Sequence, residues 1–482
     1  MKQWHELFDQ ARSAFSQQRT FERARLLGAS NLACLGRHTL SGLLCAAGQQ
    51  FADWSSSYRL FERERLDLDQ LWQVPLRSVV ESLAPGAPVV ALMDDTLVRK
   101  RGRHILGTSW RRDPLGPHFT TNFIWASRFL QLSLAMPALA GAQSCGARAV
   151  PVDLVHAPSP RKPSRRAAPE QWTNWRAASA ASAVSALGAR RIDALRQSLD
   201  QLSQGRERAL WMCTDATFTN RTVLKRLPPR TTLIGRIRKD ARLYALPRPQ
   251  EQHPGRGRCR YYGQPLPTPE QYRQQDAIPW QTVEAFAAGQ VYRFDIKYLA
   301  PLRWKNGSGK MPIALLIVRP VAYRLRQTSR LNYRKPAYLI CTDLTLSPQQ
   351  ILQAYLWRWE IEVNFRDEKT LLGVGQPQVR TDAAVRTTTA FSVFTYALLL
   401  LALHRCRFAH RPLPPPRWQR ASQPSPNGRV STQQALALFR SQLWANSLRA
   451  HNKSGFAAAT RSTEKPLQNF NSLQSAVLYA TG

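Results

Sequence analysis

The sequence has few acidic residues and no paired cysteines. It contains 31 Asp and Glu against 68 Lys and Arg, which gives a net charge of +37 and an isoelectric point near 11.1. A charge this large exceeds what solubility requires and predicts a polyanionic partner. The seven cysteines are scattered singly, without a CxxC pair. This pattern argues against a disulfide framework and a structural zinc site, and it favours a reducing cytosol.

Several other signatures are missing. The nine histidines form no HExxH or other metal-ligand spacing, no GxSxG precedes a helix, and no GxxxxGK[ST] is present for a nucleotide. The N-terminus lacks the apolar stretch of a signal peptide. The one long uncharged run, 387–403, is shorter than the roughly 18 apolar residues of a membrane span. We therefore interpret it as a buried helix and expect no membrane partner.

The length of the chain favours several structural units. At roughly 100–200 residues per domain, 482 residues correspond to two to four units. Composition and periodicity divide the chain into a helical N-terminal region (1–80), an α/β segment (85–239), a β-rich insertion (240–334), a second α/β segment (335–405), and a Pro/Arg-rich linker with a short helix and a polar tail (406–482).

The N-terminal region has two possible roles. A helix is followed by a turn at Gly36 and by a second helix with apolar residues at 40, 43, 44 and 47, after a plausible N-cap at Thr39. This order of elements fits a helix-turn-helix that binds DNA. It fits a small packing bundle equally well, so both interpretations stay open.

Two short apolar runs end in acids. Residues 88–93 (PVVALM) lead to Asp94 and Asp95, and residues 209–214 (ALWMCT) lead to Asp215. Unbroken apolar runs of this length are typical of strands that are buried on both faces. Because successive side chains of a strand alternate, Asp94 and Asp95 point to opposite faces and only one of them can join a common site.

A basic segment follows the first pair of acids. Residues 96–118 contain six Lys and Arg against the single acid Asp113, with glycines that indicate turns. A basic hairpin beside carboxylates is suited to contact a phosphate backbone. The alternative is a charged loop that is merely solvated.

The stretch from Tyr355 to Gly373, YLWRWEIEVNFRDEKTLLG, is predicted to be one helix. At about 100° per residue, Tyr355, Arg358, Glu362 and Lys369 fall within about 60° of one another. The acids at 360, 367 and 368 fall outside this face. Glu362 is therefore the one acid of the helix that lies among a phenol, a guanidinium and an ammonium, and the alternative interpretation of this face is an ordinary ion-pair network.

Three carboxylates from distant parts of a chain suit a two-metal site. Mg²⁺ prefers carboxylate oxygens and keeps several waters. Two such ions activate the attacking oxygen and stabilise the leaving oxygen in phosphoryl transfer. Two acids at strand ends and one on a later helix can converge in this way, although many acids at strand ends are only caps and turn residues.

The helix also carries a family pattern. The spacing Y-x2-R-x3-E-x6-K, filled by Tyr355, Arg358, Glu362 and Lys369, resembles the signature of insertion-sequence DDE transposases of the Tyr-Arg-Glu-Lys (insertion-sequence-four-like) group. The Trp at position 359, directly after Arg358, also resembles the residue found at this position in members of this group.

The acid segments extend this resemblance. DDT at 94–96 and TDATFTN at 214–220 look like the first and second Asp segments of the family, and the resemblance covers roughly residues 85–375. In the family the first Asp is often followed directly by Thr or by another small or aromatic residue. This favours Asp95 over Asp94 as the first acid.

The resemblance implies an α/β fold: an RNase H-like mixed sheet flanked by helices, split into 85–239 and 335–405 by a β-rich insertion before the Glu362 helix. It implies a transposase that binds the inverted repeats of its own element, cleaves the ends and transfers the 3′-OH strands into target DNA. In this scheme Asp95, Asp215 and Glu362 hold two Mg²⁺ ions, for which Mn²⁺ can substitute, and Tyr355, Arg358 and Lys369 contact DNA.

The partners implied are double-stranded DNA and a second copy of the chain, in a cytoplasmic protein that associates with the nucleoid when it is bound to DNA. Two alternatives remain open from the sequence. One is a nuclease of the same fold without strand transfer. The other is a domesticated, non-catalytic DNA-binding protein.

Overall fold

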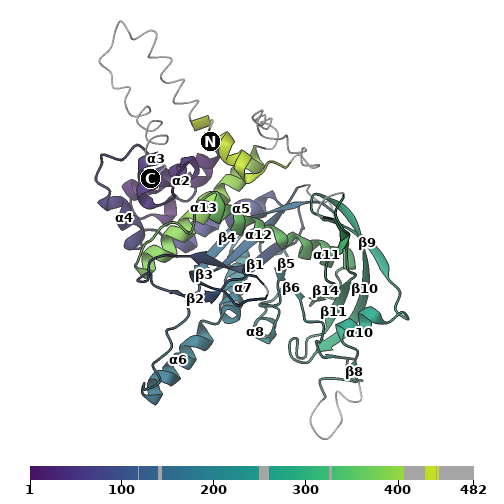
Figure 1. The fold of residues 1–482 in the computed structure, drawn as a ribbon. Helices are drawn as coiled ribbons and strands as arrows, with labels where there is room; N and C mark the ends of the chain where they lie inside the picture. The colour runs from purple at the N-terminus through teal and green to yellow at the C-terminus, as the bar shows by residue number, and fades with distance from the viewer. Residues whose placement is uncertain are drawn as a thin grey trace.

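The computed structural model describes residues 1–117, 119–138, 144–248, 260–324, 328–406, 429–440 and 442–443. These residues form a mixed sheet of twelve strands flanked by helices (Figure 1). The predicted fold class, an RNase H-like α/β architecture, is confirmed. Most of the linker and tail predicted for 406–482 lies outside the described residues.

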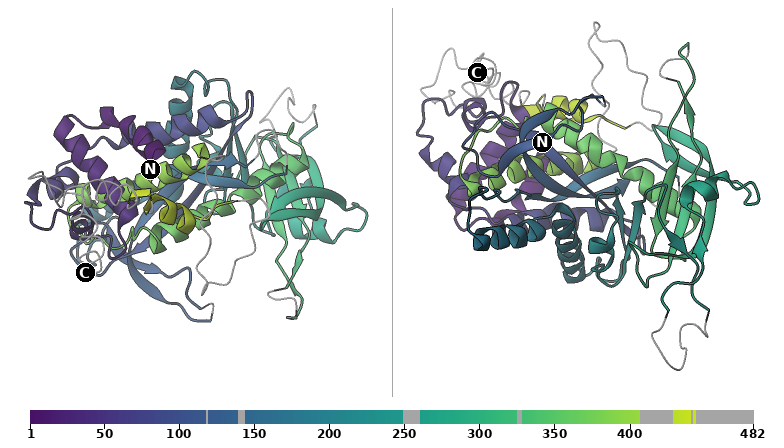
Figure 2. Two further views of the ribbon diagram at one scale, coloured as in Figure 1. Left: turned by 90° about the horizontal axis from the view of Figure 1, so that it is seen from above. Right: turned by 60° about the horizontal axis from the view of Figure 1, so that its bottom comes forward.

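A layer of helices forms the N-terminal region. These helices pack around α13 (Asp382–Arg405), as Figures 1 and 2 show. Asn31 donates to the hydroxyl of Thr395 at 2.8 Å and so ties the layer to α13. The elements are α1 (Lys2–Asp9), η1 (Arg12–Ala14), α2 (Gln18–Ala33), α3 (Leu40–Ala46), α4 (Ser55–Glu62) and α5 (Leu68–Ser82).

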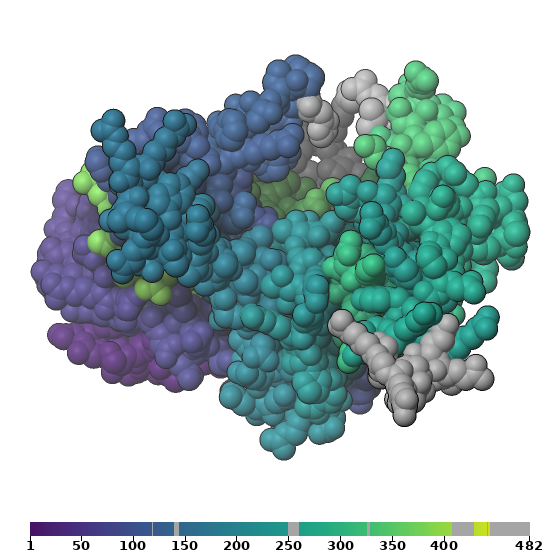
Figure 3. All heavy atoms as spheres, turned by 90° about the horizontal axis from the view of Figure 1, so that it is seen from below, coloured from purple at the N-terminus to yellow at the C-terminus, as the bar shows by residue number. Residues whose placement is uncertain are grey.

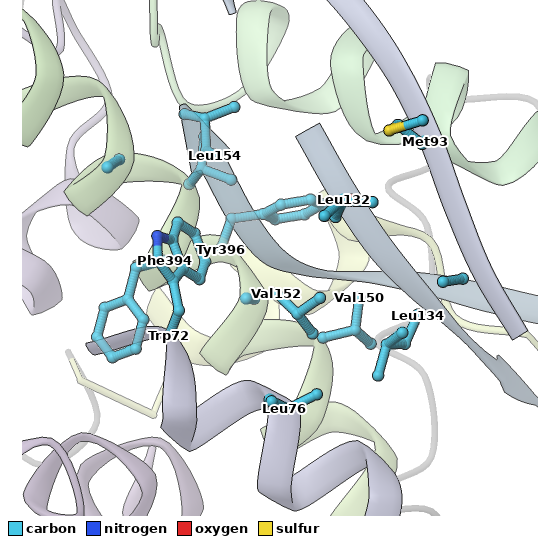
Figure 4. Close-up of a cluster of buried hydrophobic side chains, with 14 of the residues drawn as sticks. Trp72, Leu76, Met93, Leu132, Leu134, Val150, Val152, Leu154, Phe394 and Tyr396 are labelled. Carbon is cyan, nitrogen blue, oxygen red and sulfur yellow. The ribbon is translucent and has the colours of Figure 1, made fainter. Parts of the chain in front are cut away.

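The helix α13 contains the long uncharged run of the sequence. It is long and apolar enough to cross a membrane, but 83% of its most apolar window is buried inside the protein. Figure 4 shows Phe394 and Tyr396 of this helix among the side chains of Trp72 and of strands β3 (Phe123–Pro137) and β4 (Ala147–His156). The helix thus contributes to the core of the protein.

The sheet is centred on three parallel strands. β1 is the long strand Val89–Arg99, and it pairs in parallel with β5 (Leu210–Thr214), which pairs in parallel with β6 (Thr231–Arg236). On its other side β1 pairs with β3 in an antiparallel arrangement, and β3 pairs with two further strands. These strands are β2 (Thr108–Arg112), β3 (Phe123–Pro137) and β4 (Ala147–His156).

The insertion extends the same sheet, apart from a short strand pair at 322–323 and 332–333 that forms its own small sheet. The connection is β14 (Ala337–Cys341), just after the insertion: it pairs antiparallel with β6, and β11 (Ile313–Val318) and β10 (Gln290–Trp304) of the insertion follow in order. The green strands at one end of the molecule in Figure 2 belong to this part. Its remaining elements are β7 (Leu243–Tyr244), β8 (Pro265–Leu266), α10 (Pro269–Gln274), β9 (Gln281–Ala287), β12 (Ala322–Tyr323) and β13 (Asn332–Tyr333).

Helices cover both faces of the central strands. On one face Gly188 of α7 lies so close to Phe218 and Met93 that a Cβ atom would stand 2.8 Å from the Phe218 ring. On the other face Leu92 and Cys213 belong to a core cluster with Ile361. The helices of the first face include α7 (Val184–Gln201) and α8 (Arg221–Leu224), and those of the second include α11 (Pro348–Trp357) and α12 (Trp359–Thr370). The helix α6 (Pro169–Ala181) contacts α7 and buries none of its residues.

Candidate functional site

Asp94 and Asp215 lie side by side on neighbouring strands. In the parallel pairing of β1 with β5, Leu92 is the partner of Cys213 and Met93 is the partner of Thr214. The next residues are the two acids, so they stand at the same level, about 4.8 Å apart from strand to strand. By alternation they share the face of Leu92 and Cys213, which is the face covered by α12.

The third acid comes from a helix that is interrupted. The sequence predicts one helix from 355 to 373, but the structure has α11 and α12, which meet at Arg358. Arg358 keeps helical dihedral angles (φ −54°, ψ −32°), so the two helices continue in nearly one direction while the hydrogen-bond ladder is broken. Tyr355, Arg358 and Glu362 therefore still share a face.

Arg358 joins the strand acid to the helix acid. Its Nη1 donates to Oδ2 of Asp94 at 3.0 Å, and its Nη2 donates to Oε1 of Glu362 at 3.0 Å. Its guanidinium carbon lies 5.7 Å from the centre of the Tyr355 ring. Burial alone would lower the pKa of Arg358, but Tyr355, Asp94 and Glu362 together raise it. The bridging group therefore stays charged.

The pKa of Asp94 is shifted from its ordinary value. Burial, together with the nearby Asp215 and Asp95, raises the pKa of Asp94 to about 7, although Arg358 acts in the opposite direction. A carboxyl group in such a site favours an additional cation, because a cation stabilises the ionised form that burial disfavours.

Asp95, the acid favoured by the sequence, has a different environment. It lies on the opposite face of β1 from Asp94, and its Oδ2 is 3.2 Å from Nε of Arg128 on β3. Burial and the nearby Asp215 raise the pKa of Asp95, whereas Arg128 and Arg111 act to lower it. The structure thus brings Asp94 together with Glu362 and turns Asp95 towards an arginine pair.

Asp215 is oriented by a local turn. Its carboxylate accepts from the backbone N–H and from the hydroxyl of Thr217, each at 2.9 Å. The segment reads Asp-x-Thr, and Asp94 begins a second Asp-x-Thr with Thr96. This shared spacing is a signal in the sequence that favours Asp94 over Asp95, and the prediction of Asp95 overlooked it.

The buried pair of Gln131 and Glu368 was not predicted either. Gln131 is the β3 partner of Asp94, and its Nε2 donates to Oε1 of Glu368 at 3.0 Å. Glu368 is only 2% exposed, and burial raises its pKa to about 8, against the opposing effects of Gln131 and Lys369. A helical wheel places Glu368 outside the Glu362 face, so only the tertiary structure reveals that it packs beneath the site.

Lys369 lies apart from the Arg358 bridge. Its ammonium is 5.8 Å from the centre of the Phe365 ring, and Glu368 is the nearby acid that raises its pKa against the larger lowering effect of burial. Of the four signature residues, the structure therefore brings Tyr355 and Glu362 into contact with Arg358. Lys369 extends the same helix towards its C-terminal end.

The donor set fits a hard divalent cation. Asp94, Asp215 and Glu362 offer carboxylate oxygens, which Mg²⁺ prefers. Within the part of the chain that the structure describes, no group of three or more His, Cys, Asp or Glu already surrounds a single point. The guanidinium of Arg358 stands between Asp94 and Glu362, so these acids can enclose an ion only if Arg358 moves away from one of them.

The chain also matches a known protein family. Residues 12–296, more than half of the chain, match a family model described as DDE superfamily endonuclease. The matched range contains Asp94, Asp95 and Asp215 and ends before Glu362. A comparison with curated proteins gives no match.

Proposed function

Since this chain belongs to the DDE superfamily endonucleases, which act on DNA and generally use divalent metal ions, we propose that it is the transposase of an insertion sequence. It binds the terminal inverted repeats of its element, cleaves the ends, and joins the freed 3′-OH strands to target DNA. The observation that carries this proposal is the arginine bridge between Asp94 and Glu362 beside Asp215.

We assign the metal-binding role to Asp94, Asp215 and Glu362, with Asp94 in place of the Asp95 that the sequence favoured. The shared register and face of Asp94 and Asp215 support this choice, as does the pairing of Asp95 with Arg128. Asp94, Asp215 and Glu362 would hold two Mg²⁺ or Mn²⁺ ions, which would supply Lewis-acid activation of the attacking oxygen and charge stabilisation of the leaving oxygen. The protein contributes the placement of the three carboxylates.

The helix residues contact DNA in this proposal. Arg358 and Lys369 neutralise phosphates near the acids, and Tyr355 offers a hydroxyl to one of them. The net charge of +37 supports double-stranded DNA as the partner. Because two ends must be cut together, we expect two copies of the chain on the DNA, in a cytoplasmic protein that is found at the nucleoid when it is bound.

The test uses the full-length protein and duplexes made from the DNA that flanks its coding region. We expect cleavage that requires Mg²⁺ or Mn²⁺ and stops with EDTA. Glu362→Gln should abolish it, while Glu360→Gln serves as the matched control, because Glu360 lies on the same helix but pairs with Arg429. Full cleavage by Glu362→Gln would overturn the assignment. Incubation of pre-cut ends with a target plasmid then separates a transposase from a nuclease without strand transfer.

A further inference from the structure

An exposed aromatic cluster lies on the hairpin of β2 and β3. In this antiparallel pair Trp110 is the partner of Trp125, and Arg112 is the partner of Phe123. By alternation along β3 these residues share the face of Gln131, which contacts α12. Trp110 and Phe123 are each 55% exposed. Large aromatic side chains on one face of a hairpin are suited to stack on a flat ligand.

The exposed indole is held in place by its neighbours. The rings of Trp110 and Trp125 meet edge to face with centres 5.6 Å apart, and the guanidinium carbon of Arg103 lies 4.9 Å and 5.1 Å from their centres. Trp125 is fixed in turn by a 3.0 Å hydrogen bond from its indole N–H to the carbonyl of Gly102. A preorganised ring loses little conformational entropy when it stacks on a ligand.

The charge around the cluster selects the ligand. Residues 99–123 contain six Lys and Arg and a single acid, Asp113, which is paired with Arg99 at 2.7 Å. Arg101, Arg103 and Arg112 are exposed. A second copy of the chain would present the same positively charged hairpin, so it is a poor partner for this surface. The combination of cations and aromatic rings is instead typical of surfaces that bind single-stranded nucleic acid.

The sheet register sets the distance between this cluster and the acids. Asp94 is opposite Gln131, and Trp110 is opposite Trp125, six residues earlier on β3. At about 3.3 Å per residue this is ~20 Å measured along the strands, or about six nucleotides at the duplex rise of 3.4 Å each. Figure 3 shows blue atoms of the first part of the core and green atoms of the insertion on the same side of the molecule.

We propose that Trp110, backed by Arg103 and Trp125, is a stacking platform for an unpaired base of the DNA about six nucleotides from the phosphate held at the acids. This inference rests on the proposed function, because it assumes that the DNA is held at Asp94, Asp215 and Glu362. It adds a DNA contact outside the Tyr355–Lys369 helix and explains why an indole stands exposed on a basic hairpin.

The experiment compares two DNA probes in Ca²⁺ by fluorescence anisotropy: a forked duplex with unpaired strands at one end, and a fully paired duplex of equal length. Stacking of one base is worth ~1 kcal/mol or more, so Trp110→Ala should weaken binding of the forked probe at least about fivefold and leave the paired probe unchanged. Trp110→Phe should restore most of the affinity. Phe51→Ala, at a site that is 88% exposed, is the control and should change neither.

Position is tested with abasic substitutions along the unpaired strand. Loss of the base about six nucleotides from the phosphate at which the active protein cuts should weaken wild-type binding and have no added effect in Trp110→Ala. Equal binding of the forked probe by wild type and Trp110→Ala would overturn the proposal. So would an equal loss with both probes, or a loss of self-association with DNA binding intact, which would make the cluster a protein contact.

The same preparations separate this inference from the proposed function. If the protein cleaves DNA in Mg²⁺ but Trp110→Ala does not change binding of forked DNA, the stacking proposal is wrong and the proposed transposase function stands. If Trp110→Ala selectively weakens binding of forked DNA but no metal-dependent cleavage is found, the proposed transposase function is wrong. The hairpin then still binds DNA, but its distance from a reacting phosphate is no longer assigned.

Discussion

The Nη1 of Arg358 lies 3.0 Å from Oδ2 of Asp94, so a residue between two helices holds the central strand of the sheet. The side chains of both residues are largely buried, with exposed fractions of 12% for Arg358 and 18% for Asp94. A contact of this kind affects both the stability of the fold and the charge of the site.

Arg358→Ala should destabilise the protein by about 2–3 kcal/mol, because it leaves Asp94 buried without its cation. The free energy of unfolding in urea measures this loss. The double variant Arg358→Ala/Asp94→Asn should lose less free energy of unfolding than the sum of the losses in the two single variants. Arg293→Ala, which removes an exposed ion pair with Glu284, is the control and should cost at most ~1 kcal/mol.

Asp94→Asn and Asp95→Asn should have unequal effects on cleavage. If Asp94 holds a metal ion, its substitution should reduce the rate at least about 100-fold. Asp95→Asn disturbs the contact with Arg128 on the opposite face of β1 and should leave most of the activity. The measurement is single-turnover cleavage of an end duplex. If only Asp95→Asn loses activity, Asp95 and not Asp94 is the first metal-binding acid, as the sequence indicated.

Metal affinity should rise with pH through neutrality. The pKa of Asp94 is raised to about 7, chiefly by burial, so below that pH a proton competes with the cation for this carboxyl group. Apparent Mn²⁺ affinity should therefore increase up to about tenfold per pH unit between pH 6 and 7 and level off above. Calorimetric titration measures this trend. Asp94→Asn should flatten it, and a slope that persists in this variant would assign the proton to another group.

Glu368→Gln should change how stability depends on pH. The folded-state pKa of Glu368 is raised to about 8 from 4.5, chiefly by burial, so the folded protein binds the extra proton between these values. Its contribution is fully favourable below pH 4.5 and is lost as the pH rises towards 8. The neutral amide avoids this loss, so the variant should gain stability over wild type at high pH. The free energy of unfolding in urea is measured at pH 5 and at pH 8 for both proteins. An equal change between these pH values in wild type and in Glu368→Gln would contradict the assignment.

The sequence predicted those features that depend on local patterns. Apolar runs before Asp94 and Asp215 predicted two strands, and helical periodicity placed Glu362 beside Arg358. Asp215 does follow the end of β5, but β1 continues to Arg99, so the prediction that Asp94 lies at the end of its strand is wrong. The choice between Asp94 and Asp95 depends on which face of β1 meets α12. Alternation along the strand does not identify that face, and the Asp-x-Thr spacing shared with Asp215 is the one signal in the sequence that points to Asp94. The burial of Glu368 likewise depends on Gln131 of a distant strand.

The pairing of β14 with β6 has a consequence for attempts to shorten the protein. Because β6 is bonded to β5 on one side and to β14 on the other, a truncation that removes β14 with the insertion would leave the backbone of β6 unpaired along one side. An open strand edge of this kind promotes aggregation. A minimal version of the enzyme should therefore keep β11 and β14 as a cover and trim only the loops and short strands beyond them.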